Sequence, residues 1–384
     1  MRGIYLHIPF CVRKCSYCDF YSVEEDRNAV EDFRDLLVRE MDLLREKFPA
    51  EADVPADTVF FGGGTPTVLG AEKLCWILAA LKARFPIAPD AEVTTEANPG
   101  TVSAEDFRTL RDGGFNRISI GVQSFDPATL RTLGRIHGVD EVRAAHGDAK
   151  RAGFASIGID LIFGVPGQGL SDWAADLDLA VTFLPAHVSA YALAPEPGTP
   201  IHDAIQRGEL RMPSDETIAD MYGETRRALS RAGYRHYEIS NFARPGSECR
   251  HNLKYWRRAG YLGLGPSAHG LLFPPGRAPL GFRTANPPSL PDYRLRIEEA
   301  RLPWGDTHVC NIEDAWKESL IAGLRMVEGV DLAEIEKIMG PPTEAVRSAV
   351  DTLVRAGKLQ GEGSRLRIPP AFLFVSNEVL QALA

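Results

Sequence analysis

The feature that most constrains the fold of this chain is the alternation of short β-rich runs with longer helical patterns. The β-rich runs predict strands at 3–8, 58–61, 92–96, 117–122, 156–163, 187–193 and 235–239. The helical patterns predict helices at 30–47, 71–84, 104–113, 139–152, 170–183 and 215–232. Strands separated by helices of this length predict βαβ units and a parallel sheet. About six such units favour an α/β barrel or partial barrel over a flat doubly wound sheet.

Unusual residues directly follow several of these predicted strands. Three cysteines lie within 11–18, after the first strand, and a glycine run lies at 62–65, after the second. Residues 96–98, Gln123 and Pro166 follow later strands. In an α/β barrel the functional site is built at the carboxyl ends of the strands. The placement of these residues therefore supports the barrel and indicates one site at that rim.

The bulk composition limits the class of protein. The chain has 384 residues, of which 44% are hydrophobic, enough for one large domain and a smaller one. It has no apolar run long enough to span a membrane, and its first residues lack the apolar core and cleavage site of a signal peptide. We therefore expect a cytoplasmic protein. The net charge of −9 argues against a nucleic-acid partner.

The composition changes in the last third of the chain. Six prolines at 272–291 predict a long surface connection. Helices and a hairpin at 359–368 follow, and together they resemble a winged-helix module. Acidic residues outnumber basic ones from 313 to 384, so we expect a cap or a protein contact instead of DNA binding. The expected domains are a barrel over 1–240, a connecting segment over 241–292 and a smaller, mainly helical domain over 293–384.

The three clustered cysteines Cys11, Cys15 and Cys18 form a CxxxCxxC pattern. Thiolates hold iron–sulfur clusters, and a cubane cluster takes one ligand per iron. Three cysteines therefore predict a [4Fe–4S] cluster with one open iron, which can bind the amino and carboxylate groups of S-adenosylmethionine. Zinc is an alternative, but it requires four ligands and no fourth Cys or His follows at suitable spacing. Buried structural cysteines are a second alternative.

A CxxxCxxC pattern just after a first strand resembles the signature of the radical S-adenosylmethionine family. The run Gly62-Gly63-Gly64-Thr65 resembles the glycine motif of that family. Glycine lets backbone groups approach a ligand closely. A plain tight turn is the alternative interpretation of the run.

Within that family the chain resembles the oxygen-independent coproporphyrinogen III oxidase branch over nearly its whole length. The segments that carry the resemblance are 5–11, 62–66, 96–100, 117–125, 133–137 and 160–167. The resemblance implies S-adenosylmethionine contacts at Tyr5, Gly63, Gly64, Thr65, Glu96, Gln123, Arg135, Asp160 and Ala194. Tyr17 and Gln123 also match positions tied to a second S-adenosylmethionine site. Taken singly, each of these polar residues could equally be a strand-end residue or a surface ion-pair partner.

The branch holds two kinds of protein, and three features favour one of them. The oxidase continues CxxxCxxC with another cysteine, where this chain has Phe20. It also carries an amino-terminal arm, which has no room before Cys11. The segment 251–256 matches the HNxxYW motif of the HemW-type heme chaperones. We therefore expect a protein that binds heme and transfers it to an acceptor protein, with an electron donor for the cluster. The alternative is the oxidase, which decarboxylates coproporphyrinogen III to protoporphyrinogen IX.

The HNxxYW motif also has a physical interpretation. Imidazole is a common axial ligand of heme iron, which makes His251 a candidate. Tyr255 and Trp256 offer flat apolar area for a macrocycle, and Asn252 could orient the imidazole or a propionate. The alternative for His251 is a packed, hydrogen-bonded histidine.

Other cysteines and a second histidine are weaker candidates. Cys249 is a second choice for the iron, or else a small buried hydrophobe, while Cys75 and Cys310 are expected in the core. Ser267 and His269 follow in a glycine-rich segment that either lines the pocket or forms a turn-rich connection.

Overall fold

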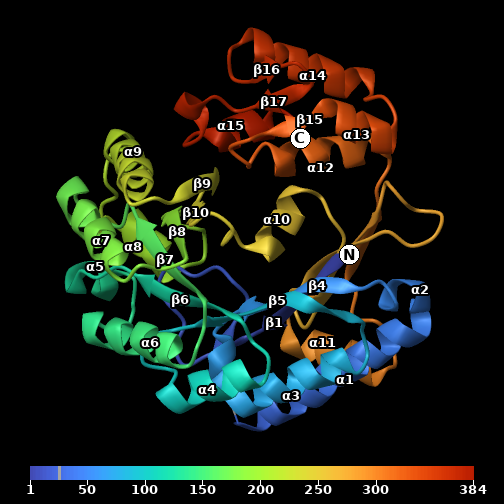
Figure 1. Cartoon of the computed structure of the whole chain (residues 1–384), viewed down its shortest axis with the longest axis horizontal. Coiled ribbons are helices and arrows are strands. Elements are labelled where there is room, and N and C mark those ends of the chain that lie inside the picture. Colours follow the sequence, from blue (N-terminus) through green and yellow to red (C-terminus); the bar gives the residue numbers. More distant parts are fainter. Residues whose placement is uncertain (25–26) are drawn as a thin grey trace.

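The computed structural model describes residues 1–24 and 27–384. Its centre is a mixed sheet in which six adjacent strands run parallel (Figure 1). These strands are β1 (Arg2–Ile8), β4 (Ala56–Gly63), β5 (Ile87–Ala97), β6 (Arg117–Gln123), β7 (Ser156–Phe163) and β8 (His187–Ala192). The helices that alternate with them are α1 (Arg27–Lys47), α3 (Ala71–Lys82), α4 (Ala104–Asp112), α6 (Val139–Arg151), α7 (Leu170–Thr182) and α9 (Asp215–Arg231). The predicted partial (β/α)6-type barrel is confirmed.

Apolar spacing and capping explain why these helices form and where they pack. In α1 the side chains of Phe33, Leu37 and Met41 are fully buried, and their spacing of four residues places them on one face. At the start of α4 the Ser103 hydroxyl accepts a hydrogen bond from the Asp106 backbone, and the Asp106 carboxylate accepts one from the Ser103 backbone. This capping box satisfies two backbone donors that the helix leaves unpaired.

Further strands extend the parallel sheet at both edges, and all of them except β11 (Tyr261–Leu264) pair antiparallel to their neighbours. At one edge β10 (Asn241–Ala243) pairs with β8 and with β9 (Arg235–Glu238). At the other, β11 runs parallel to β1 and is followed by the antiparallel strands β12 (His269–Leu272), β13 (Phe282–Ala285) and β14 (Asp306–Val309). The expected strand at 235–239 thus exists but belongs to a hairpin. The two residues between β9 and β10 are too few for the crossover that a parallel partner needs.

The proline-rich segment is only partly the connection that the sequence predicted. It contains β13 and the first residues of α11 (Leu290–Glu298), and its prolines flank β13 on both sides. A strand of four residues between prolines gives little periodic signal. Because β14 still pairs in the large sheet and α11 packs against α1, we propose that the barrel unit extends to about residue 311. It thus passes its predicted end at 240 and the predicted start of the carboxyl-terminal domain at 293.

The carboxyl-terminal unit has the winged-helix arrangement that the sequence suggested. It contains α12 (Ile312–Gly323), α13 (Leu332–Met339), α14 (Glu344–Arg355) and α15 (Ser376–Gln381). The strands β15 (Val330–Asp331), β16 (Gln360–Glu362) and β17 (Arg365–Arg367) form a small sheet. The remaining short elements of the chain are β2 (Phe10–Cys11), β3 (Val23–Glu24), α2 (Pro49–Ala52), η1 (Pro66–Leu69), α5 (Pro127–Thr132), α8 (Pro200–Gln206), α10 (Arg250–Trp256) and η2 (Pro370–Phe372). No helix among the described residues is long and apolar enough to cross a membrane.

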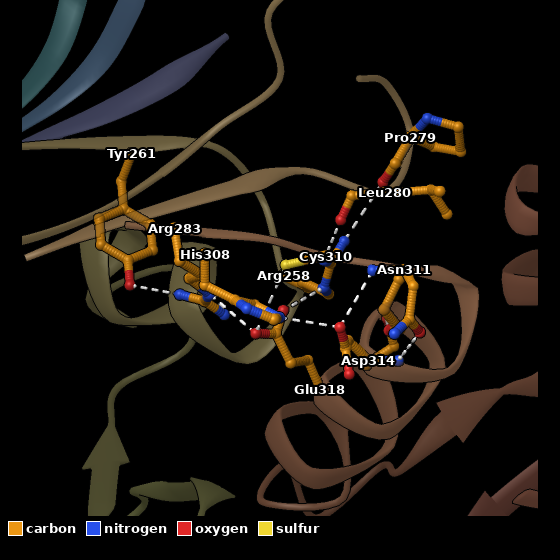
Figure 2. Close-up of polar contacts among 12 residues, drawn as sticks. Arg258, Tyr261, Pro279, Leu280, Arg283, His308, Cys310, Asn311, Asp314 and Glu318 are labelled. Carbon is orange, nitrogen blue, oxygen red and sulfur yellow. Dashed lines mark hydrogen bonds and ion pairs between the residues drawn. The ribbon is translucent and has the colours of Figure 1, made fainter. Parts of the chain in front are cut away.

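A polar network fastens the carboxyl-terminal unit to the sheet (Figure 2). Glu318 of α12 accepts hydrogen bonds from Arg258 at 2.7 Å and from Arg283 of β13 at 2.9 Å. Arg283 also donates to the hydroxyl of Tyr261 at 2.8 Å. Burial favours a raised pKa for Glu318, but the two guanidinium groups outweigh it and the net direction is downward. The network therefore links α12 to a tyrosine of the barrel sheet.

A buried carboxyl group of α1 joins that helix to α11 and to the loops that follow β11 and β13. Glu40 is fully buried and accepts hydrogen bonds from the Gly265 backbone at 2.8 Å, from Asn286 at 2.8 Å and from the Tyr293 hydroxyl at 2.7 Å. Burial raises the pKa of Glu40 from 4.5 to about 7, against the opposite effect of these donors. The folded chain therefore holds a proton at Glu40 over a pH range in which the unfolded chain has lost it.

Glu40 should give the free energy of unfolding a defined pH dependence. Between pH 4.5 and about 7 the folded state binds more protons at this site, so stability falls as the pH rises through this window. The shift corresponds to roughly 3 kcal/mol. Glu40→Gln, which carries no charge, should flatten this part of the profile in urea unfolding at several pH values. An identical slope in the wild type and the variant would contradict the assignment; the exposed Glu72→Gln serves as the control.

Candidate functional site

The loop that carries the three cysteines is held on both sides by backbone hydrogen bonds. Thr65 of the glycine motif donates its backbone N–H to the Phe10 carbonyl at 2.7 Å. Ser16, between the second and third cysteines, donates its backbone N–H to the Leu133 carbonyl at 3.2 Å. The loop is thus fixed between the ends of β4 and of the segment after β6, which places its thiols at the carboxyl rim of the barrel.

The cysteine thiols lie in a partly buried, mixed environment. Burial raises the pKa of Cys11, and it raises the pKa of Cys18 to about 11. Arg135 donates a hydrogen bond to the Cys15 sulfur at 3.3 Å and so brings a positive charge to the thiols. A metal ion deprotonates a coordinating thiol outright, so iron would displace these protons.

The three cysteines and most of the predicted cofactor residues line one cavity of about 430 Å³. The predicted residues in its wall are Cys11, Cys15, Tyr17, Cys18, Gly63, Gly64, Thr65, Glu96, Gln123, Arg135, Asp160 and Ala194. They belong to all six parallel strands or to the loops that follow them, and Asp160 lies within β7. The structure thus brings together side chains that are up to 183 residues apart in sequence, between Cys11 and Ala194.

Two carboxyl groups give the cavity its electrostatic character. Asp160 accepts hydrogen bonds from the Ser119 hydroxyl at 2.8 Å and from the Ser189 hydroxyl at 2.6 Å. Burial raises the pKa of Asp160, and burial together with the Asp160 charge raises the pKa of Glu96 to about 8. One fixed carboxylate beside one readily protonated carboxyl can pair with neighbouring hydroxyl groups, such as those of a ribose.

Arg135 is already engaged within the protein. Besides Cys15, it donates to the Asn98 side chain at 2.6 Å and to the Gly121 carbonyl at 2.7 Å. Asn98 in turn donates to the Thr65 hydroxyl at 2.9 Å. The guanidinium group therefore joins three segments of the rim and leaves only part of its donors for a carboxylate.

The glycine motif is shaped by contacts inside the protein as well as by space for a ligand. Gly63 has a φ of +108°, and a Cβ there would lie 2.6 Å from the His7 ring. A Cβ on Gly64 would lie 2.6 Å from the Phe10 carbonyl. Close packing of β4 on β1 and on the cysteine loop thus requires glycine here. A side chain at Gly63 would therefore collide with the His7 ring.

The residues present fit a [4Fe–4S] cluster and S-adenosylmethionine. Among the residues that the structure describes, no three His, Cys, Asp or Glu side chains gather to hold a single metal ion. A cubane cluster instead needs thiols spread around its faces, one for each of three irons. Cys11, Cys15 and Cys18 line one cavity together with Arg135, Glu96 and Asp160, and so offer three thiols to such a cluster.

A second cavity of about 520 Å³ adjoins the first and is rich in aromatic side chains. Its wall contains Tyr5, His7, Asp19, Phe20, Tyr21, Tyr255, Tyr261, Ser267 and His269. Asp19 and Phe20 line both cavities, so the end of the cysteine loop is the wall between them. Tyr5, predicted to contact S-adenosylmethionine, lies in this second cavity and not among the residues that line the first.

The HNxxYW motif forms the short helix α10, which packs against β1, β4 and α12. Of its four predicted heme residues, only Tyr255 lines the aromatic cavity. His251 is 1% exposed; its Nδ1 is 2.8 Å from the Thr58 hydroxyl and its Nε2 is 2.8 Å from the Tyr255 hydroxyl. Both ring nitrogens are thus occupied, which disfavours His251 as an iron ligand in this conformation.

The other residues of the motif face elsewhere. Trp256 stacks against the guanidinium group of Arg325, 4.6 Å from its ring centroid, at the contact with the carboxyl-terminal unit. Asn252 is half-buried and does not line either cavity. The motif therefore connects the barrel to the carboxyl-terminal unit and offers Tyr255 to the aromatic cavity.

The remaining cysteines lie outside both cavities. Cys249 is buried, with its sulfur 3.7 Å from Glu92. Cys310 is buried in the network of Figure 2, with its sulfur 4.0 Å from Glu318. Cys75 is half-buried and donates to the Thr109 carbonyl at 3.4 Å. All three have structural surroundings, as expected for Cys75 and Cys310.

Several residues of the two cavities were not singled out from the sequence, among them three with polar aromatic rings. Tyr191 lines the first cavity, while His7 and Tyr261 line the second. His7 lies two residues after Tyr5 on β1, and alternation along a strand places both on the same face. That spacing could have linked His7 to the site, whereas Tyr261 and Tyr191 carry no such local signal.

Comparison with known families agrees with this geometry. A family model described as the Radical SAM superfamily matches residues 5–180, and one described as the HemN C-terminal domain matches residues 312–374. Coproporphyrinogen III oxidase (HemN) from Escherichia coli, a radical SAM enzyme, has the same fold with a TM-score of 0.84 and 23% identity. That comparison covers 100% of this chain and 90% of the other. The fold and the cysteine loop are therefore those of a radical SAM protein, a class that implies a [4Fe–4S] cluster and S-adenosylmethionine.

Curated relatives define the family more narrowly. Heme chaperone HemW of Mycobacterium tuberculosis is 36% identical over 99% of this chain and 94% of its own length. Heme chaperone HemW of Bacillus subtilis is 33% identical over 100% of this chain and 99% of its own length. Heme chaperone HemW of Escherichia coli is 36% identical over 93% of this chain and 91% of its own length. The chain belongs to the HemW heme-chaperone family, and the resemblance found in the sequence is confirmed.

The three cysteines of the loop should hold the cluster together. Replacing Cys11, Cys15 or Cys18 by Ala should remove the visible absorbance of the reconstituted cluster, because one iron would lose its only protein ligand in each variant. Cys75→Ala and Cys310→Ala are matched controls that should keep it. Full iron and sulfide content in the triple variant would refute the assignment.

The carboxyl pair should contribute to S-adenosylmethionine binding. Glu96→Gln should lower its affinity roughly tenfold, the scale expected for one lost hydrogen bond at a buried group. The cluster absorbance should stay unchanged, because Glu96 does not touch the thiols. Equilibrium dialysis measures the affinity, and the exposed Glu105→Gln is the control. Equal affinity in wild type and Glu96→Gln would remove Glu96 from the site.

Proposed function

We propose that this chain is a heme chaperone, which binds heme beside a [4Fe–4S] cluster and transfers it to an acceptor protein. The observation that carries the proposal is the aromatic cavity that adjoins the cysteine-lined one across Asp19 and Phe20. Its flat aromatic walls suit a macrocycle, since aromatic side chains bury large apolar areas. The relatives named Heme chaperone HemW support the same function.

In this proposal the first cavity holds the cluster and S-adenosylmethionine. Cys11, Cys15 and Cys18 each bind one iron, and the cluster supplies one-electron chemistry when bound. The cofactor contacts are Gly63, Gly64, Thr65, Glu96, Gln123, Arg135, Asp160 and Ala194. Gln123 has a φ of +67°, which is uncommon for a residue other than glycine. Tyr17 lies in the same wall, so a second S-adenosylmethionine would have to share this cavity.

The second cavity holds heme in this proposal. Tyr255 supplies one wall, and His251 positions Tyr255 through the hydrogen bond between Nε2 and the phenol. Tyr5 changes role relative to the sequence prediction and contributes to the heme wall instead of the S-adenosylmethionine site. Trp256 and Asn252 support the motif from outside the cavity, with Trp256 stacked on Arg325.

The partner proteins of this chain belong to the same proposal. An acceptor receives heme, an electron donor reduces the cluster, and the acidic carboxyl-terminal unit is a protein contact instead of a nucleic-acid one. Arg283 connects Glu318 of that unit to Tyr261 of the heme wall, so a partner bound there would act on a wall residue through two hydrogen bonds. We propose the cytoplasm as the location, because clusters with open irons need a reducing compartment.

The second candidate function is coproporphyrinogen III oxidation, which the fold shared with HemN favours. A tetrapyrrole beside a radical cofactor would suit either activity. Phe20 separates the two functions in this chain: where the oxidase carries a cysteine, it places an exposed apolar ring in the wall between the cavities.

Two anaerobic assays of the reconstituted protein separate the functions. Incubated with heme and then with an apo-heme protein, the chain should bind about one heme and release it to that acceptor. Incubated with coproporphyrinogen III, S-adenosylmethionine and a reductant, it should form no protoporphyrinogen. Protoporphyrinogen formation would establish the oxidase, and an absence of heme binding would reject the chaperone.

A further inference from the structure

We propose that His269, outside the HNxxYW motif, is the axial ligand of the heme iron. The inference rests on the proposed heme function and deepens it by naming the iron ligand. It comes from a comparison of the histidines and tyrosines at the aromatic cavity, which differ in whether their ligating atoms are already occupied. Heme iron accepts a histidine nitrogen or a tyrosine oxygen as axial ligand, so these are the groups to compare.

Two of the three histidines near the cavity are committed to other contacts. His7 is buried, with Nε2 2.8 Å from the Tyr21 carbonyl and Nδ1 3.2 Å from the Tyr5 hydroxyl. His251 is equally enclosed between Thr58 and Tyr255. A histidine with both nitrogens hydrogen-bonded must give up one bond and leave a buried partner unsatisfied before it can bind iron.

His269 is the exception among the described residues. It lines the cavity, is solvent-exposed, and its ring makes no hydrogen bond to any other described residue. Burial of part of the ring and the charge of Arg283 lower its pKa, so the imidazole is neutral near pH 7. Neutral imidazole is the form that ligates iron.

Four tyrosines line the cavity, and they are poor competitors for iron; the hydroxyl of Tyr21 accepts a hydrogen bond from the Leu290 backbone N–H at 2.6 Å. Burial raises the pKa of Tyr5, of Tyr255 and of Tyr261, so these phenols keep their protons near neutral pH. Tyrosine binds heme iron as the phenolate. These rings are therefore suited to contact the macrocycle faces and edges, which leaves the iron to the imidazole.

The backbone around His269 holds it in one place. His269 begins β12 and pairs with Ala285 of β13. On its other side the chain approaches Gly263 so closely that a Cβ there would lie 2.1 Å from the His269 carbonyl. Ser267, two residues earlier, has a φ of +62°, a strained conformation typical of functional sites. A ligand on a strand fixed from both sides is well placed for a defined iron geometry.

Heme titration of the full-length protein, followed by its Soret spectrum, tests the assignment. Wild type should show an imidazole-type spectrum. His269→Ala should lose it, with affinity lowered by about tenfold or more, and added free imidazole should restore it. His251→Ala, the competing candidate, should keep the imidazole-type spectrum, although the loss of its bond to Tyr255 can weaken binding. His308→Ala, exposed and outside both cavities, is the matched control and should keep both spectrum and affinity. His269→Cys should change the spectrum to a thiolate type, because the new side chain would supply the ligand.

The outcomes distinguish this inference from the function on which it rests. If wild type binds heme and His269→Ala and His269→Cys give the wild-type spectrum and affinity, the ligand assignment is overturned and the chaperone function stands. If His251→Ala alone loses the imidazole spectrum, His251 is the ligand and the assignment is likewise overturned. If wild type binds no heme, the proposed function fails first. Retained cluster absorbance in each variant shows that the barrel has folded.

Discussion

Six parallel strands end at one rim of the barrel, and the position of the cysteine loop on that rim determines the rest of the site. Backbone hydrogen bonds from Thr65 to Phe10 and from Ser16 to Leu133 fix the loop between neighbouring strand ends. The loop then serves two purposes, because its thiols face one cavity while Asp19 and Phe20 face both. A cluster and a bound tetrapyrrole would therefore share a wall only a few residues thick. In a protein that handles heme, this places the cluster where it can respond to the cargo.

The hydrogen bonds at both ring nitrogens of His251 indicate a structural role for the HNxxYW helix. A histidine near a heme cavity is an obvious candidate ligand, yet His251 is enclosed by Thr58 and Tyr255 and is stacked on Phe60 with ring centroids 5.3 Å apart. Its surroundings resemble a structural support that sets the position of Tyr255. Trp256 continues the support outward to Arg325. The motif thus couples the cavity wall to the carboxyl-terminal unit, and the Glu318 network of Figure 2 provides a second connection through Tyr261.

The sequence predicted the features whose signal is local. The strands and helices of the barrel follow from periodicity, and the cysteine spacing identifies the cluster loop without any tertiary information. Features set by distant contacts were not predicted. The antiparallel extension β12–β14 consists of four-residue strands, and prolines surround β13. Tyr5 lines the aromatic cavity and not the cavity of the other predicted cofactor residues, and a position on a strand does not say which neighbour lies beside its face. The difference between His251 and His269 depends on partners as remote as Thr58, which no spacing within 251–269 can reveal.

The central claim is that heme binds next to the cluster, in the cavity that Asp19 and Phe20 separate from the thiols. Electron paramagnetic resonance of the reduced cluster, recorded with and without copper(II) protoporphyrin, tests it most directly, because this paramagnetic heme analogue does not accept the electron of the cluster. The bound analogue in the adjoining cavity should broaden the cluster signal and speed its relaxation. An analogue that is stoichiometrically bound but leaves both the line width and the relaxation unchanged would place the macrocycle elsewhere and contradict the account.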